Sequence, residues 1–142
     1  MGLFVEAFTG LNGRLAAQLA EHQLGNVEFE VLLRLARSND GELRMTDLAT
    51  QTGLSTSGVT RVVDRLERDG LAGRRSCKTD RRGAFTVITE SGRNRLLAVL
   101  PGHVQLIEEW FTGRLDDDEL RQLLDGLRVI RDAVHPGAAA GI

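Results

Sequence analysis

Residues 46–89 decide the fold of this chain: TDLATQTGLSTSGVTRVVDRLERDGLAGRRSCKTDRRGAFTVIT. The pattern predicts a short helix, a tight turn at Gly53, and a second helix that opens at Ser55 and ends at Gly70. A basic segment follows and leads into the strand-forming run 84–89, which predicts a β-hairpin. Helix, turn, helix and hairpin in this order predict a winged helix-turn-helix, which offers duplex DNA a helix for the major groove and a wing for the minor groove.

The second helix of this segment has two faces. Val59, Val62, Val63 and Leu66 recur at i, i+3, i+4 and i+7, which predicts one buried stripe. The opposite face begins with small hydroxyl side chains, which let the helix approach a groove closely, and continues with arginines that bind guanine or phosphate. The residues of this face that we expect to contact DNA are Ser55, Thr56, Ser57, Thr60, Arg61 and Arg65.

The loop of the expected hairpin carries a cluster of cations. Lys78, Arg81 and Arg82 lie there with one acid, Asp80, two residues before Arg82. A carboxylate at this spacing can hold the Arg82 guanidinium in one orientation, so that less conformational entropy is lost when it enters a minor groove. The plainer alternative is a surface ion pair worth about 0 to 1 kcal/mol, with no part in binding.

The distribution of charge supports a DNA partner, although the total does not. The net charge is −2, yet residues 61–95 hold ten Lys or Arg against five acids, which leaves an acidic remainder. Phosphate attraction depends on the local field, so the basic segment fits a DNA contact and the acidic remainder argues against non-specific coating. The alternative for the basic segment is a solvated helix face beside a soluble hairpin.

Composition indicates one globular domain over residues 1–142, with 42% hydrophobic and 27% charged residues. The single cysteine, Cys77, excludes an internal disulfide framework and fits a reducing compartment. No apolar run approaches the length of a membrane span, and the N-terminus lacks the basic region of a signal peptide. We therefore expect a cytoplasmic protein with no membrane partner.

The N-terminal third is expected to be helical. An apolar repeat predicts a first helix that runs to about His22, and Asn26 is placed to cap a second. Residues 43–45 are expected to form a short strand, after which Thr46 would cap the third helix.

The C-terminal third predicts two more helices. Thr89 is placed to cap a long helix with a kink at Pro101, and the acids at 116–119 precede a final helix. We expect dimerisation helices over about 1–24 and 90–135, around a winged lobe over about 26–89. Residues 136–142 are expected to form a loose tail.

The terminal helices carry more apolar surface than one small domain needs, which favours a homodimer. A two-fold dimer would place two recognition helices about one DNA turn apart on a near-palindromic site. The alternative is an extended single-chain core. The residues expected at the dimer interface are Phe4, Phe8, Leu11, Leu120, Leu123, Leu124, Leu127 and Ile130.

Short motifs in one order and spacing connect this chain with a known family: Leu48-Ala49, Gly53-Leu54-Ser55, Val59-Thr60-Arg61, Asp64-Arg65-Leu66-Glu67, Asp69-Gly70-Leu71, Arg74-Arg75, Asp80-Arg81-Arg82 and Ile88-Thr89-Glu90-Ser91-Gly92. In these residues the chain resembles the MarR (multiple antibiotic resistance regulator) transcription factors. The resemblance implies an obligate homodimer, a recognition helix over 55–68, and a wing arginine at Arg82 positioned by Asp80. It also implies that DNA binding is relieved by a small, often phenolic, effector or by oxidation.

Other chemistry is weakly supported. His22, His103 and His135 lack metal-ligand spacing and are expected to be solvated or capping residues, so we expect no metal, no cofactor and no catalysis. Cys77 has cationic neighbours that would lower its pKa and favour a reactive thiolate. A redox switch through Cys77 is one interpretation, and a passive cysteine at a strand end is the other. The redox sensors of the resembling family carry their cysteine in the first helix, where this chain has none.

The sequence thus predicts a mostly α protein with a small β-hairpin wing that acts as a dimeric, effector-released repressor of double-stranded DNA targets. Two alternatives remain at this point. One is a winged helix used as a protein-interaction module, and the other is a ligand sensor without operator binding. Exposed hydroxyls and arginines on one helix face favour DNA over either alternative, because protein-binding surfaces tend to expose aromatic residues instead.

Overall fold

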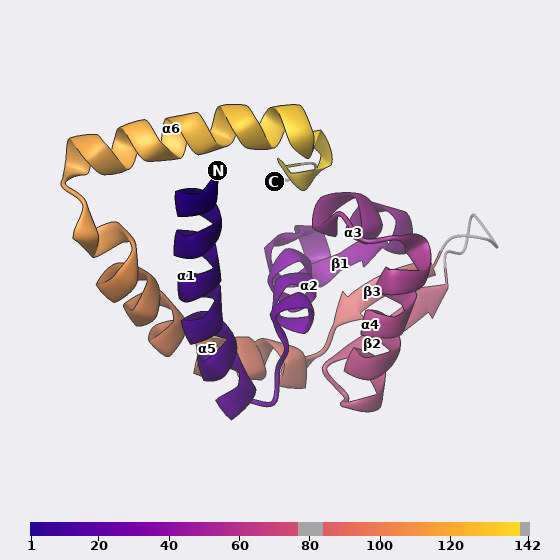
Figure 1. Cartoon of the computed structure of the whole chain (residues 1–142). Helices are drawn as coiled ribbons and strands as arrows, with labels where there is room; N and C mark the ends of the chain where they lie inside the picture. Colours follow the sequence, from indigo (N-terminus) through magenta and orange to yellow (C-terminus); the bar gives the residue numbers. More distant parts are fainter. Residues whose placement is uncertain (77–83, 140–142) are drawn as a thin grey trace.

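The computed structural model describes residues 1–76 and 84–139 of this 142-residue chain. Its elements form a helical protein with one small antiparallel sheet, as the sequence predicts (Figure 1). In chain order they are α1 (Gly2–Glu21), α2 (Asn26–Arg37), η1 (Asn39–Gly41), β1 (Glu42–Arg44), α3 (Met45–Thr52), α4 (Thr56–Arg68), β2 (Ala72–Ser76), β3 (Ala84–Ile88), α5 (Glu90–Trp110), η2 (Thr112–Arg114), α6 (Asp117–Val134) and η3 (Pro136–Ala139).

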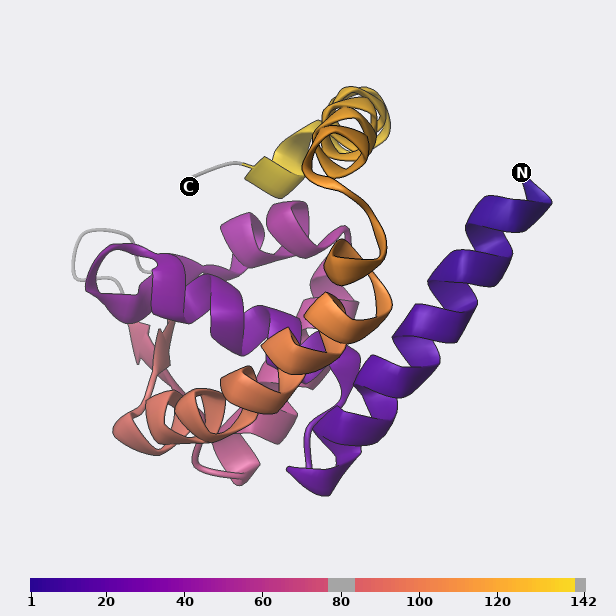
Figure 2. The ribbon, with the colours of Figure 1, turned by 90° about the vertical axis from the view of Figure 1, so that its left-hand side faces the viewer.

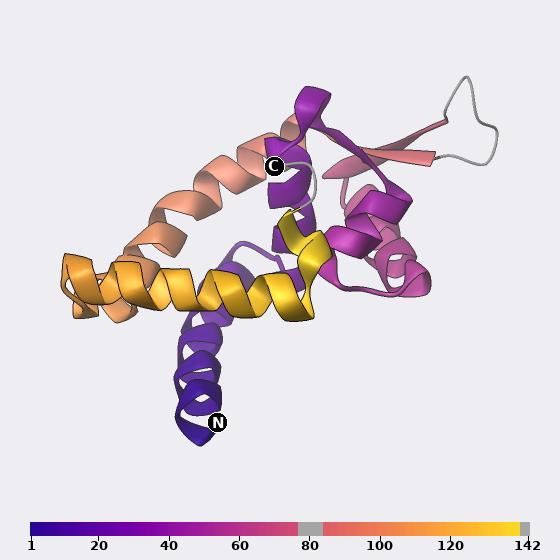
Figure 3. The same cartoon turned by 90° about the horizontal axis from the view of Figure 1, so that it is seen from above.

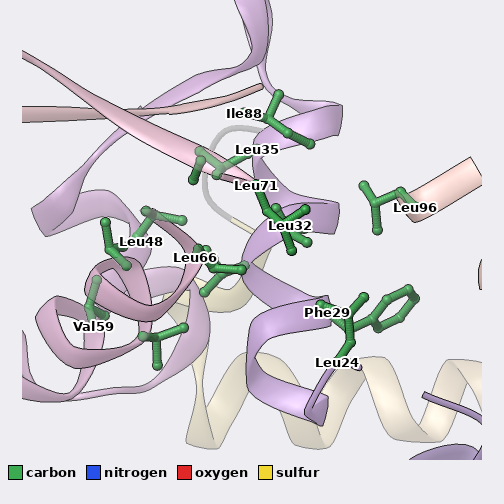
Figure 4. Packing of buried hydrophobic residues seen from close by; sticks show 14 of the residues in the cluster. Leu24, Phe29, Leu32, Leu35, Leu48, Val59, Leu66, Leu71, Ile88 and Leu96 are labelled. Atoms are coloured by element: carbon green, nitrogen blue, oxygen red, sulfur yellow. The ribbon is translucent and has the colours of Figure 1, made fainter. Parts of the chain in front are cut away.

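The core lies where α2, α3, α4 and the start of α5 meet the sheet. The expected stripe of α4 is buried throughout, which confirms that prediction. Leu32 of α2, Leu48 of α3 and Leu66 of α4 are completely buried and come together in one cluster (Figure 4). Because this cluster joins both helices of the helix-turn-helix to α2, it fixes the orientation of α4 and of the polar face that α4 exposes.

The turn between α3 and α4 depends on one glycine. Gly53 follows α3 with φ +66°, a left-handed conformation that side chains other than glycine rarely adopt. Two residues later Ser55 caps α4, where its hydroxyl accepts a hydrogen bond from the Gly58 amide at 3.1 Å. The tight turn at Gly53 and the start of the second helix at Ser55 were predicted from the sequence, and together they set the angle between the two helices.

The sheet has the order β1-β3-β2, with both pairs antiparallel. β2 and β3 are the arms of the expected hairpin, paired from Ala72 opposite Ile88 to Ser76 opposite Ala84. One face is directed inward, where the fully buried Thr86 donates a hydrogen bond to the Met45 sulfur at 3.1 Å. The hairpin is therefore attached rigidly to the helical lobe at its base.

Three expected element boundaries are wrong. The strand occupies 42–44 and not 43–45, and α3 starts at Met45, so Arg44 occupies the cap position expected for Thr46. The reason is tertiary, because strand pairing with β3 holds the backbone extended as far as Arg44. Likewise Gly25, and not Asn26, caps α2, since the Glu28 carboxylate accepts from the Gly25 amide at 2.6 Å.

Helix α5 is one continuous helix through Pro101, as expected, and it begins at the Thr89 cap. The Thr89 hydroxyl accepts from the Gly92 amide at 3.0 Å and donates to the Gly70 carbonyl at 2.7 Å, which ties the helix start to the end of α4. Gln18 of α1 crosses to α5, where its side-chain amide donates to the Val99 carbonyl at 3.1 Å. The first contact therefore holds the start of α5 to the winged lobe, and the second holds α1 to α5.

Helix α6 begins as predicted, with Asp116 accepting hydrogen bonds from the amides of Asp118 and Glu119. Unlike α5, it has no buried residue, and it runs across the molecule toward α3 (Figure 3). Figure 2 shows the N-terminal half of α1 standing clear of α6, although the two overlap in the view of Figure 3. Within the described ranges, no helix combines the length and the apolar character needed to cross a membrane.

The expected loose tail is wrong for the residues that the structure describes. Pro136–Ala139 form the short helical turn η3, and Ala138 is 9% exposed. The physical reason is specific contact with the lobe, because Arg34 of α2 donates a hydrogen bond to the Ala138 carbonyl. Residues 140–142 of the expected tail lie outside the described part.

Candidate nucleic-acid interface

The N-terminal turn of α4 exposes the small hydroxyl residues that the sequence singled out. Ser55, Thr56 and Ser57 are exposed, and the Ser55 and Ser57 hydroxyls lie 3.1 Å apart. Thr60 is half-buried, and its hydroxyl donates to the Thr56 carbonyl at 2.8 Å, which leaves its lone pairs free to accept. This turn therefore offers hydroxyls and free helix amides to a groove or a phosphate without steric obstruction.

Arg61 and Arg65 occupy different environments although both lie on the exposed face of α4. Arg61 is exposed, and no acidic partner for it occurs in the part of the chain that the structure describes. Arg65 makes an ion pair with Glu28 of α2, with 2.7 Å from its Nε to the carboxylate. Arg61 is therefore available to DNA as it stands, whereas Arg65 must exchange its partner or share it.

An ion-pair clamp that the sequence did not reveal joins α4 to the wing. The guanidinium of Arg74 on β2 binds two carboxylates of α4, with 2.6 Å to Asp64 and 2.5 Å to Glu67. Asp64 and Glu67 are three residues apart and so lie on one face of the helix. That spacing is the only signal for the clamp in the sequence. It can be interpreted only once β2 is known to lie beside α4.

A second arginine holds the far side of the hairpin base. Arg75 of β2 binds Glu42 of β1 with two hydrogen bonds, one of them 3.0 Å from Nε. Arg75 and Arg44 also lie on either side of Phe85 in one row across the three strands, with guanidinium carbons 5.0 and 5.1 Å from the ring centre. Arg74 and Arg75 thus serve the architecture of the wing, although composition alone would place them in the DNA-binding patch.

The wing residues expected to bind DNA lie outside the described residues. These are Lys78, Arg81 and Arg82, together with the proposed orienting acid Asp80 and the cysteine Cys77. The structure describes the strands that flank them as far as Ser76 and Ala84.

The three histidines have separate environments. His135 is the residue that caps the end of α6, as expected, and His22 is half-buried at the end of α1. His103 is buried, contrary to expectation, because the α1–α5 packing encloses it. Its ring lies 4.5 Å from that of Phe29, its Nδ1 is 3.2 Å from the Gln18 amide oxygen, and burial lowers its pKa. Among the described residues, no group of acidic, histidine or cysteine side chains could hold a metal.

Five of the eight residues expected at a dimer interface line an apolar hollow between α1, the end of α5 and α6, namely Phe4, Phe8, Leu11, Leu123 and Leu127, whereas Leu120, Leu124 and Ile130 are not part of its lining. Its volume is about 430 Å³. Phe4 and Phe8 are stacked with ring centres 6.5 Å apart, and Phe8 is 60% exposed. Guanidinium groups of Arg14 and Arg114 lie 3.8 and 5.1 Å from the centre of the Trp110 ring. The residues that line the hollow are Leu3, Phe4, Ala7, Phe8, Leu11, Trp110, Phe111, Leu123 and Leu127.

A helix-turn-helix with an exposed hydroxyl and arginine face, followed by a clamped β-hairpin, defines a winged-helix DNA-binding protein. The sequence of residues 22–83 matches the family model described as MarR family. The HTH-type transcriptional regulator MhqR of Bacillus subtilis (strain 168) is 30% identical over 122 residues, which covers 86% of this chain and 82% of MhqR. The chain belongs to the MarR family of transcriptional regulators, and this membership agrees with the expectation of a regulator and not an enzyme.

Solved structures of the same family match nearly the whole chain. Sco3205, a MarR family regulator from Streptomyces coelicolor solved in complex with DNA, has a TM-score of 0.90 at 31% identity, covering 97% of this chain and 87% of Sco3205. CouR from Rhodococcus jostii RHA1, solved with bound p-coumaroyl-CoA, has a TM-score of 0.80 at 25% identity, covering 90% of this chain and 88% of CouR. The fold of the terminal helices is therefore shared along with the winged lobe.

Proposed function

We propose that this chain is a homodimeric repressor that binds a near-palindromic operator and is released from it by a small-molecule effector. The observation that carries the proposal is the exposed face of α4. There, unobstructed hydroxyls at the helix start stand one turn before Arg61, a cation without an acidic partner among the described residues. Such a face fits a major groove, where hydroxyls and arginine reach base edges and phosphates. The DNA-bound structure of Sco3205 supports this use of the fold.

The apolar surface of the terminal helices supports the dimer. Helix α6 has no buried residue, and its Ile130 and Val134 are 60% and 77% exposed. A protein seldom leaves such a surface in water unless another molecule covers it. A second copy related by a two-fold axis would cover it and would place two α4 helices on successive major grooves, where the bound dimer excludes polymerase from an overlapping promoter.

The apolar hollow supports an effector, and because its lining includes residues that we also place at the dimer interface, the effector would bind where the two copies meet. Its volume and lining suit a small aromatic molecule, and the arginines next to Trp110 provide positive charge near this lining residue for an acidic group of the ligand. CouR, solved with an aromatic acyl-CoA, shows that a protein of this family can hold such a ligand. An effector shifts the protein away from DNA only if it binds the non-binding arrangement more tightly than the DNA-competent one.

Binding to labelled duplex DNA from upstream of the chain's own gene, measured across a salt series, tests the proposal. Wild type is compared with Arg61→Ala and Arg82→Ala, and a randomised duplex pool serves as a second source of sites. We expect tight wild-type binding with a steep salt slope, and weaker binding by each variant with a shallower slope. Failure of the wild type to select any duplex would overturn the operator-binding proposal and favour an interaction module or a ligand sensor.

A further inference from the structure

The last described residues of the chain close on the helix-turn-helix itself. After α6, residues 135–138 turn back and lie against α3 and the turn that follows it (Figure 1). We call these four residues the C-terminal clasp. No residue of α6 between Asp117 and Val134 is fully buried, whereas the η3 turn that follows packs against both α3 and α6.

His135 makes the first contact of the clasp. Its Nε2 lies 2.9 Å from the Thr50 carbonyl, which belongs to the last turn of α3 and has no partner within that helix. The imidazole donates this hydrogen bond through Nε2–H when neutral and also when protonated. The same ring covers Gly53, where an added Cβ would lie 3.3 Å from the His135 Cε1 atom. His135 thus contacts both the end of α3 and the turn before α4.

Gly137 and Ala138 make the second contact. A Cβ on Gly137 would lie 2.4 Å from the Thr50 Cγ2 atom and 3.1 Å from the Thr50 carbonyl oxygen, so this glycine allows a close approach that no other residue permits. Ala138 is buried beside it, and its carbonyl accepts a hydrogen bond from Arg34 of α2. The clasp is therefore a fitted contact and not an accidental one.

The middle of α6 lines the apolar hollow. Leu123 and Leu127 contribute to its wall together with Phe4 and Trp110, and Trp110 is the only tryptophan of the chain. Helix α6 consequently forms part of the wall of the hollow, and the clasp that follows it contacts the helix-turn-helix. A helix is stiff along its axis, so a displacement of one part is transmitted to the other.

We propose that the C-terminal clasp couples the position of α6 to the position of α3 and of the turn before α4. The regulatory meaning of this coupling rests on the proposed function, because an effector in the hollow that displaces α6 would then act on the helix-turn-helix through the clasp. Coupling of this kind is reciprocal. A change at the clasp must therefore alter the structure around the hollow, just as a change at the hollow must alter the position of α3.

A matched pair of glycine substitutions tests the coupling. Gly137→Ala adds a methyl group where it collides with Thr50, whereas Gly126→Ala adds the same group on α6 with nothing within 4 Å. Two readouts are measured on the full chain without DNA. The first is amide hydrogen exchange in peptides from α3 and from α2, and the second is acrylamide quenching of Trp110 fluorescence. Peptides from α2 report whether the core of the lobe remains folded.

For Gly137→Ala we expect exchange in α3 to accelerate by roughly five-fold, as for the loss of one hydrogen bond, together with a changed quenching constant of Trp110. Gly126→Ala should leave both readouts at the wild-type values. His135→Ala, which removes the hydrogen-bond donor without adding bulk, should move both readouts in the same direction as Gly137→Ala. If Gly137→Ala also accelerates exchange in α2, the result for His135→Ala decides whether the coupling exists.

Unchanged α3 exchange in both clasp variants would overturn the proposal. So would faster α3 exchange with Trp110 unmoved, since the clasp would then be only a local cap on α3. Neither readout uses DNA. A failure of operator binding would therefore overturn the proposed function and leave the result on coupling intact.

Discussion

Removal of the two acids that hold Arg74 should weaken DNA binding even though it makes the protein more positive. Asp64→Asn and Glu67→Gln, combined in one chain, keep the side-chain shapes but abolish both carboxylates of the clamp. Simple electrostatics predicts tighter binding for a protein with two fewer negative charges. The clamp predicts the opposite, because β2 loses its attachment to α4 and the wing is no longer held in register with the recognition helix.

The magnitude follows from the geometry. The two hydrogen bonds are short, at 2.6 and 2.5 Å, but the side chains of Arg74, Asp64 and Glu67 are 34%, 49% and 30% exposed. Solvent screening limits such partly exposed pairs to about 0.5 kcal/mol each, so the clamp contributes roughly 1 kcal/mol. If DNA binding requires the clamped wing, the variant must supply that energy on binding, and its affinity falls by about five-fold.

The assay is operator binding across a salt series, with unfolding in urea measured in parallel. Asp69→Asn is the matched control, because it removes an acid from the exposed end of α4 that has no part in the clamp. The double variant should bind about five-fold more weakly at an unchanged salt slope, whereas Arg61→Ala should reduce the slope by about one. Equal or tighter binding by the double variant would refute a positioning role for the clamp.

Three further changes have expected outcomes in urea unfolding. Gly92→Ala should cost about 1 to 3 kcal/mol, because its Cβ would lie 2.1 Å from the Leu71 carbonyl oxygen. Gly13→Ala meets nothing within 4 Å and should instead stabilise α1 by about 0.5 to 1 kcal/mol. Ser55→Ala should cost about 1 kcal/mol through loss of the α4 cap. Burial lowers the pKa of His103 in the folded state, so the unfolded state binds a proton at this residue first as the pH falls. The free energy of unfolding should therefore decrease as the pH drops below the ordinary pKa of 6.5. A His103→Gln variant should lose less stability over the same pH range.

Features set by local sequence could be predicted. The buried stripe of α4, the left-handed turn at Gly53 and the caps at Ser55 and Thr89 each depend on residues within one helical turn of one another. Such signals survive in the folded chain when the tertiary environment agrees with them. They were enough to place the helix-turn-helix, the hairpin and the exposed polar face of α4.

Features set by long-range contact could not be predicted. Thr46 is a good capping residue, but pairing of β1 with β3 extends the strand to Arg44 and moves the helix start. Gly137 looks like a helix terminator in a tail, and only the surface of Thr50 shows why a glycine fits there. Similarly, His103 carries no local signal of burial, because the packing of α1 against α5 encloses it.

The same distinction changes how the charge of the DNA-binding region should be counted. By sequence, residues 61–95 hold ten cations that are available to phosphates. In the folded chain Arg65, Arg74 and Arg75 each bind a carboxylate, so these three contribute little to the outward field. Counterion release depends on cations that reach phosphates and not on the formal total. The salt dependence of operator binding should therefore reflect Arg61 and the wing cations, and the paired arginines should affect it mainly through the shape they give the wing.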